Sequence, residues 1–357
     1  MLAAGVCLPA VRALGASIAK LPSVGPKFST LAIDLVKNSS VIDMLGLLTL
    51  NYRKQLLWDA QPRSFRDADF QRLKDSGINI FHPAVGFVEG DIYKESLEDI
   101  TGWNLFIGAH PDRFFRVDCP DDLERAKSSG KIGIVLGLQN SEHFRTVDDV
   151  DKFYALGQRV SQLTYRDNAI GGGSVDPKNL GLTEYGRQIV TRMNDLGMAI
   201  DISHCSDRTA LDAIEASSKP VLVTHSNCRA LVPGSARCRT DEAIRKLAAK
   251  GGVLGVTMVR YFVGGGGAVT IENVLDHIDH VAKIAGIEHV GLGTDVDLDG
   301  RDHGTMPARR NDLDGINYAT KVFEITDGLI RRKYSPENIE LILGKNFERA
   351  LSAIWRA

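Results

Sequence analysis

The sequence predicts an α/β fold, a closed (β/α)8 TIM barrel with extra C-terminal helices. The chain has 357 residues, which exceeds the roughly 250 that a typical barrel of this kind needs. Short apolar runs alternate with longer amphipathic segments along most of the chain, as strands and helices of a parallel sheet do. There are eight such runs, and eight strand–helix units favour a closed barrel over an open doubly wound sheet.

Each expected strand is a short run rich in Val, Ile and Leu. Such runs are apolar on both faces, which is typical of strands covered by helices on one side and by a barrel interior on the other. In chain order, the expected strands are residues 41–47, 78–85, 132–138, 160–164, 198–203, 220–224, 253–258 and 289–293.

Between these runs lie amphipathic segments with helix start and stop signals. Several end at a glycine, the residue that most often terminates a helix. The expected helices are residues 121–129, 183–196, 206–217, 241–250 and Ile271–Ala285. Two last segments, residues 312–333 and 336–355, predict further helices packed on the outside of the barrel.

No linker or low-complexity tract divides the chain. Glycine-rich loops occur at residues 171–173 and 264–267, but neither follows a strand and opens a helix, so a dinucleotide-binding motif is not supported. We expect a single barrel domain over residues 40–357, preceded by an N-terminal arm or remnant export segment at residues 1–39.

Composition indicates an enzyme of small molecules. The net charge is -2, and 25% of the residues are charged. No basic run is present, so the sequence does not point to nucleic acid or to an anionic membrane surface. No apolar stretch approaches the roughly 20 residues of a membrane-spanning helix.

The five cysteines are odd in number and form no CxxC pair, which argues against a disulfide framework and favours a reducing compartment. We therefore expect a cytoplasmic protein. Residues 2–11 are apolar, but Arg12 follows this run instead of preceding it, unlike a secretory signal. A periplasmic location is the alternative if this segment is a truncated export signal.

Polar side chains end three of the expected strands. His204 follows the fifth strand, His225 the sixth and Asp295 the eighth. The carboxyl ends of the strands of such a barrel meet at one mouth, which carries the active site. Two imidazoles and a carboxylate suit a divalent ion such as zinc, which lowers the pKa of a bound water. A lone histidine at a strand end is more often structural, but two on consecutive strands favour a metal site.

The other histidines are weaker candidates. His82 ends the second strand and His143 follows the third, so both are possible mouth residues. We expect His277 and His280 on a polar helical face, and His110, His289 and His303 at the surface or in loops. Cys205 and Cys228 adjoin the metal candidates but are expected to be buried small residues, because side chains alternate along a strand. Trp58, Trp103 and Trp355 are expected to be packing residues.

Five sequence pieces resemble one family. They are LTYRDNAIGGG, GLTEYGRQIVTRMNDLGMAIDISHCS, KPVLVTHSNCRAL, RCRTDEAIRKLAAKGGVLGV and HVGLGTDVDLDG. In this order they resemble the membrane (renal) dipeptidases, which are zinc peptidases on an amidohydrolase-type barrel. With the strand count, the resemblance extends over about residues 40 to 350.

The resemblance implies roles for single residues. His204 and His225 match the two histidines that bind the second ion of the family's two-zinc site. Asp295 matches the aspartate that binds the first ion and accepts a proton from the attacking water. Arg237 matches an arginine that grips the carboxylate of the substrate, a task that suits a guanidinium fork. Asn227 is expected in the same pocket.

Four positions depart from the family pattern. Leu45 and Leu47 replace the histidine and aspartate that bind the first zinc, and Gln139 replaces the bridging glutamate. Tyr165 replaces a histidine that stabilises the oxyanion, although a phenol can still donate a hydrogen bond to it. Of the family's carboxylate ligands only Asp295 remains, with Asp297 or Asp43 nearby. These carboxylates carry too little negative charge to offset two divalent ions. We therefore expect one zinc ion or none.

Three functions stay open from the sequence. The leading one is a dipeptidase-like metallohydrolase of a dipeptide or small amide, in which Tyr165 polarises the carbonyl. The second is hydrolysis of another amide or lactam-like metabolite at a one-metal site. The third is a catalytically divergent or inactive barrel that binds a small carboxylate ligand without a two-zinc centre. The resemblance also implies a possible homodimer.

Overall fold

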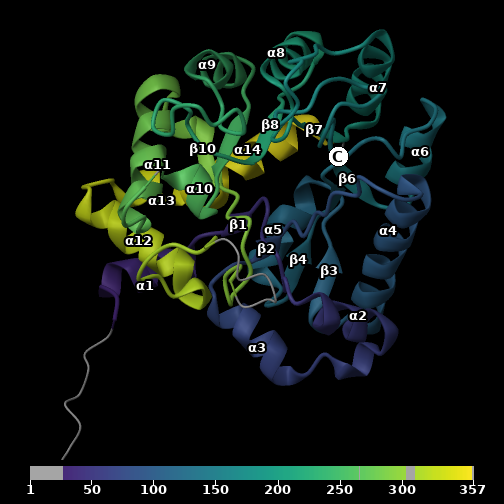
Figure 1. Ribbon diagram of the computed structural model, residues 1–357. Coiled ribbons are helices and arrows are strands. Elements are labelled where there is room, and N and C mark those ends of the chain that lie inside the picture. Colours follow the sequence, from purple (N-terminus) through teal and green to yellow (C-terminus); the bar gives the residue numbers. More distant parts are fainter. Residues whose placement is uncertain (1–26, 265, 303–309, 356–357) are drawn as a thin grey trace, which may run out of the picture.

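The structure, a computed structural model, describes residues 27–264, 266–302 and 310–355 (Figure 1). Its centre is one sheet whose paired strands are all parallel. The strands are β1 (Ile42–Asp43), β2 (Ile80–Phe81), β3 (Phe114–Arg116), β4 (Ile132–Ile134), β5 (Leu136–Leu138), β6 (Gln158–Gln162), β7 (Ala199–Asp201), β8 (Leu222–Ser226), β9 (Val253–Val256) and β10 (Val290–Leu292).

The sheet closes into a barrel through the segment 132–138. Its first half, β4, pairs with β2, and its second half, β5, pairs with β6. The remaining order runs β2-β1-β10-β9-β8-β7-β6, so every barrel strand has a neighbour on both sides. The predicted barrel is confirmed, and each of the eight predicted segments overlaps a strand. Strand β3 was not predicted and lies beside β4.

Most helices surround the barrel (Figure 1). They are α1 (Thr30–Asn38), α2 (Tyr52–Ala60), α3 (Asp67–Asp75), α4 (Ile92–Ala109), α5 (Pro120–Ser128), α6 (Asp148–Ala155), α7 (Glu184–Leu196), α8 (Asp207–Ala216), α9 (Asp241–Ala249), α10 (Arg260–Val263), α11 (Ile271–Ala285), α12 (Lys321–Arg331), α13 (Pro336–Glu340) and α14 (Asn346–Ile354). All five helices predicted between strands are present, as α5, α7, α8, α9 and α11.

The predicted C-terminal helices are confirmed in part. Residues 336–355 form a nearly continuous helix in which a π-type turn, Leu341–Lys345, joins α13 to α14. The helix predicted over residues 312–333 is too long, because α12 begins only at Lys321. Gly315 has a φ of +74°, and the Asn317 side chain caps a short 3-10 turn at Tyr318–Thr320. These features keep residues 312–317 out of the helix.

The expected N-terminal arm ends in a packed helix. Helix α1 lies against α12, and its apolar residues Ala32, Leu35 and Val36 are buried. The rest of that expected arm, residues 1–26, lies outside the described residues.

Two histidines expected at the surface are buried. His277 on α11 is 0% exposed, because it shares the inner face of that helix with Val274, Ile278 and Val281. The expectation of a polar helical face was therefore wrong for His277. His110 follows the last residue of α4, as expected of a loop residue, but it is buried and packs against the rings of Phe65 and Phe106. His303 lies outside the described residues.

The described part of the chain contains no helix that is both long and apolar enough to span a membrane.

Candidate active site

The carboxylate of Asp201 fixes the two strand ends that carry the histidines. Its Oδ1 accepts hydrogen bonds from the backbone N–H groups of Ser203 (2.9 Å) and Thr224 (3.0 Å). Its Oδ2 accepts from the Thr224 hydroxyl at 2.7 Å. Strands β7 and β8 are thereby tied together just where His204 and His225 leave them. Asp201 was not predicted as a site residue, although it begins the DISH segment that ends in His204.

His204 and His225 face each other at the barrel mouth, with 3.0 Å between their Nε2 atoms. The Thr224 hydroxyl gives its one proton to Asp201, so it accepts from Nδ1–H of His225 at 2.8 Å. This leaves Nε2 of His225 as the acceptor of the pair. Burial, reinforced by the positive charge of Arg237, lowers the pKa of both imidazoles well below the usual range. The pair is therefore neutral at pH 7.

Tyr165 covers the other side of His204. The two rings stack with centroids 4.1 Å apart and an interplanar angle of 20°. A side chain at Gly86 would meet the phenol ring at 2.7 Å, so this close packing requires a glycine there. Burial, together with the negative charge of Asp295, raises the pKa of Tyr165. Its hydroxyl is therefore protonated and can donate a hydrogen bond.

Asp295 follows β10 in a left-handed backbone conformation, with a φ of +56°. Its N–H donates to the carbonyl of Leu45 at 2.9 Å, which joins this turn to the end of β1. Its Oδ1 forms an ion pair with Nη1 of Arg301 at 2.7 Å. Arg301 lies in the loop six residues further along and was not predicted from the sequence.

The residues expected to bind substrate lie behind the mouth. Arg237 is 4% exposed and donates to the carbonyls of Ser203 (2.5 Å) and His225 (2.8 Å). Asn227 donates to the carbonyls of Thr257 and Phe262. Neither side chain is among those that line the cavity described below. Their roles toward substrate stay predictions.

Asp43 has buried partners. Its carboxylate accepts from the Thr294 N–H (2.8 Å) and hydroxyl (2.6 Å). Lys321, 0% exposed, places its Nζ 3.5 Å from the same carboxylate and donates to the carbonyl of Val296 at 2.8 Å. Asp297 accepts from the N–H of Leu50 at 2.6 Å. These contacts hold β1 and the segment after β10 together.

His82 and His143 are buried, and their hydrogen bonds are made to residues other than those of the mouth. His82 donates through Nδ1 to the carbonyl of Val135 at 3.0 Å. His143 contacts Gln158 at 3.1 Å and packs on the ring of Phe153. Burial lowers the pKa of both histidines, and neither lines the cavity.

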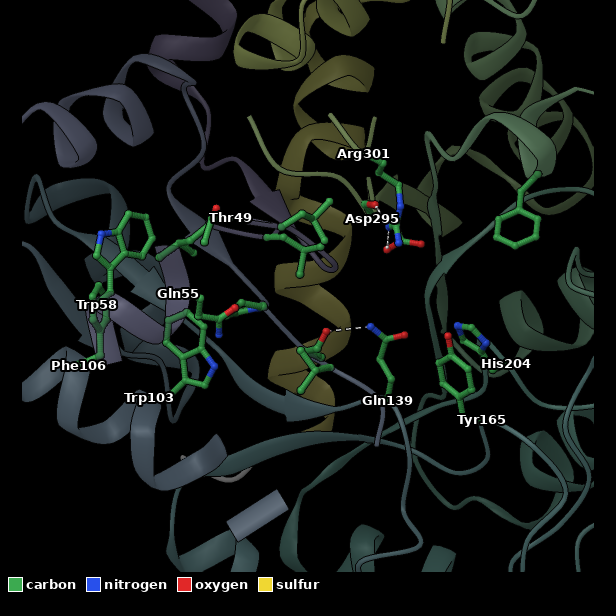
Figure 2. Close-up of a pocket in the computed structure, with 18 of the residues that line it drawn as sticks. Thr49, Gln55, Trp58, Trp103, Phe106, Gln139, Tyr165, His204, Asp295 and Arg301 are labelled. Carbon is green, nitrogen blue, oxygen red and sulfur yellow. Dashed lines mark hydrogen bonds and ion pairs between the residues drawn. The ribbon is translucent and has the colours of Figure 1, made fainter. Parts of the chain in front are cut away.

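A cavity of about 320 Å³ opens at this mouth, at the small end of the size range of ligand sites. Figure 2 shows His204, Tyr165, Gln139, Asp295 and Arg301 on one side of it. Gln139 donates to the carbonyl of Ala84 at 2.8 Å. Trp58, Trp103 and Phe106 line the opposite side. The two tryptophans therefore belong to the cavity as well as to the packing, whereas Trp355 is a buried packing residue.

The side chains do not fit a centre of two metal ions. Leu45 and Leu47 are buried at the strand end where the resemblance places ligands of the first ion, and Asp295 already pairs with Arg301. Over the described ranges, no three His, Cys, Asp or Glu side chains form a group that could hold a metal ion. The structure thus brings His204 and His225 together without gathering Asp295 into the same group. His204 and His225 are the two neutral imidazoles that could hold an ion here.

The fold and the polar mouth define a barrel of the amidohydrolase type. The profile of the membrane dipeptidase family, peptidase family M19, matches residues 30–356. The chain belongs to this family.

Individual relatives agree with this assignment. An uncharacterised dipeptidase of Schizosaccharomyces pombe is 32% identical over 278 residues, which are 74% of this chain and 62% of the relative. The chain thus spans less than two thirds of that relative's length. An amidohydrolase from Pseudomonas aeruginosa has a TM-score of 0.79 and 27% identity, over 91% of this chain and 99% of that one. The solved dipeptidase AC, described as a metallo peptidase of family M19, has a TM-score of 0.74 and 21% identity, and the match covers 89% of this chain and 99% of that one. The family is one of metallopeptidases and implies a metal ion.

Proposed function

We propose that the chain is a dipeptidase-like hydrolase of small amides, dipeptides included, whose centre works with one metal ion at most. The observation that carries this proposal is the neutral His204–His225 pair, with Nε2 atoms 3.0 Å apart, beside a small-molecule cavity. Family membership supports the reaction class, and the relatives that bear the name dipeptidase support the substrate class.

His204 and His225 would hold the ion, because both imidazoles are neutral and come from adjacent strand ends. A divalent ion bound there supplies Lewis acidity toward water and a carbonyl group. Tyr165, stacked on His204, donates a hydrogen bond from its hydroxyl to the carbonyl oxygen of the substrate as negative charge develops there. Asp295 takes a proton from the attacking water and passes it to the leaving amine, and its ion pair with Arg301 holds the carboxylate in place.

Metal analysis together with turnover tests this proposal. Protein purified without chelator is expected to bind no more than one equivalent of zinc and to hydrolyse members of a dipeptide panel. His204→Gln should abolish both zinc binding and turnover. A matched control is His280→Gln, because His280 lies on α11 and pairs with Asp241 at 2.8 Å; it should keep both. Two equivalents of zinc would refute the one-ion centre. Absence of zinc and of turnover, even after zinc is supplied, would refute the hydrolase.

One observation favours a second candidate, a divergent barrel that binds a small carboxylate ligand without catalysis. The Asp295–Arg301 ion pair and the buried Leu45 and Leu47 replace a metal-binding surface by a fixed cation and an apolar wall. This candidate predicts ligand binding without turnover in the same experiments.

The homodimer and the cytoplasmic compartment stay predictions, as does the periplasmic alternative.

A further inference from the structure

The cavity has two chemically different ends, which Figure 2 shows on opposite sides. One end consists of Trp58, Trp103 and Phe106, with Leu47 and Leu48 beside them. The other end carries Arg301 and Asp295, the only charged side chains among the described residues that line the cavity. A ligand that fills the cavity must therefore present an apolar group to one end and a polar group to the other.

The rings of the aromatic end pack edge to face against neighbouring rings. Trp103 on α4 meets Phe106 edge to face, with ring centroids 5.8 Å apart. Trp58 on α2 meets Phe65 in the same way at 5.0 Å and is 5% exposed. Such preformed aromatic surfaces lose little conformational entropy on binding. They favour a flat apolar group over a small one, because more apolar area leaves water.

The polar end has an excess of positive charge. Among the described residues, the Arg301 side chain donates only through Nη1, to Asp295. Its Nε and Nη2 carry three further N–H groups, and the side chain is 28% exposed. Behind His204 lie Arg237 and Arg239, both buried. In the part of the chain that the structure describes, these two guanidinium groups donate only to backbone carbonyls, and their Nε atoms have no hydrogen-bond partner. Buried positive charge without a paired carboxylate attracts an anion.

We propose that the cavity selects a monocarboxylate that carries an aromatic group, with the carboxylate on Arg301 and the ring on the Trp58–Trp103–Phe106 wall. The position of Leu47 supports this arrangement, since the residue that replaces a metal ligand also extends the apolar wall. The proposal deepens the proposed function by naming the ligand class of the same cavity. It concerns binding alone, so it is separable from hydrolysis.

Chelator-treated protein titrated with 3-phenylpropanoate, propanoate and 3-phenylpropan-1-ol tests this proposal. None of these probes contains an amide bond, so binding is measured without turnover. Two of the three tryptophans of the chain line the cavity, so intrinsic fluorescence reports binding, and calorimetry supplies the affinity. We expect 3-phenylpropanoate to bind at least about tenfold more tightly than either other probe, since each lacks one of the two recognised groups.

Variants assign each preference to one end of the cavity. Arg301→Gln should abolish the preference for the acid over the alcohol. Arg301→Gln combined with Asp295→Asn, which also removes the carboxylate left unpaired, should give the acid and the alcohol equal affinity. Trp103→Ala should reduce the preference for 3-phenylpropanoate over propanoate at least about fivefold. Arg192→Gln removes a surface arginine that pairs with Asp151 and should keep both preferences. Circular dichroism establishes that each variant is folded.

Equal affinities of the three probes for the natural protein would overturn the proposal, as would unchanged preferences in folded Arg301 or Trp103 variants. If the zinc-supplied protein cleaves dipeptides in that case, the hydrolase proposal still stands. If 3-phenylpropanoate binds as expected and no dipeptide is cleaved, the hydrolase proposal fails and the ligand class stands.

Discussion

Acid should destabilise the protein through His277, a buried histidine that is held neutral. Nδ1 of its ring accepts the N–H of Cys228 at 3.1 Å, so Nε2 carries the proton and donates to the carbonyl of Val263 at 3.1 Å. Protonation would set a second ring N–H against the N–H of Cys228. Burial is the main cause that lowers the pKa of His277 to about 4. Lowering the pH from 7.5 to 5 is the perturbation that tests this arrangement.

The magnitude follows from linkage. The unfolded chain takes up this proton near pH 6.5, and the folded chain does so only near pH 4. A folded-state pKa that is depressed in this way gives stability that is complete above pH 6.5 and is lost as the pH falls toward 4. Each pH unit in this window costs about 1.4 kcal/mol. His277 alone therefore removes about 2 kcal/mol from the free energy of unfolding at pH 5.

Urea unfolding at half-unit intervals between pH 7.5 and 4.5 measures the slope. His143 contributes a similar loss, because burial also lowers its pKa to about 4. His277→Gln should lower the stability at pH 7.5 through its lost hydrogen bonds, and should reduce the slope below pH 6.5 by about 1.4 kcal/mol per pH unit. His143→Gln should act likewise, and the double variant should lose both contributions. A slope that is identical in the natural protein and in His277→Gln would refute the neutral buried imidazole.

Two further predictions concern buried groups near the mouth. Lys321→Met should lower the free energy of unfolding in urea by about 3–5 kcal/mol, since it leaves the Asp43 carboxylate buried without a cation. The double variant Lys321→Met with Asp43→Asn should regain much of this loss. An equal loss in the single and the double variant would contradict the ion pair. Cys205, Cys228 and Cys238 are buried, and burial raises the pKa of their thiols, that of Cys205 to about 11. Peptide mapping after maleimide treatment of native protein at pH 7 should find all three unmodified, and labelling of any of them before unfolding would contradict the packing.

The barrel could be predicted because its strands carry a strong local signal. Runs such as 253–258 are apolar on both faces, and the end of each run marks the mouth. His204, His225 and Asp295 were found in this way, without knowledge of distant contacts. His277 was within reach of the same reasoning, since positions 274, 278 and 281 of its helix are apolar and define the buried face that it shares.

The aromatic side of the cavity and Arg301 had no comparable pattern in the sequence. In helix α2 the apolar residues Leu56, Leu57 and Trp58 are consecutive instead of falling on one face. Neither the helix nor the place of Trp58 in the cavity was therefore predicted. Arg301 lies in an irregular loop, where only the three-dimensional path of the chain shows that its guanidinium reaches Asp295. The site residues at strand ends could therefore be predicted from the sequence, whereas those on helix α2 and in the loop of Arg301 could not.

Two carboxylates at the strand ends of the mouth each lie beside a positively charged side chain. Arg301 neutralises Asp295, and Lys321 lies beside Asp43, so each of these strand-end carboxylates has a side-chain cation within 4 Å. A metal ion bound to Asp295 would lie close to Arg301, and two positive charges so close repel each other strongly in a partly buried site. Changing Gln139 to glutamate alone would therefore supply a ligand without removing the competing cation. The Arg301 guanidinium thus already supplies, beside Asp295, the positive charge that a metal ion would bring to this carboxylate.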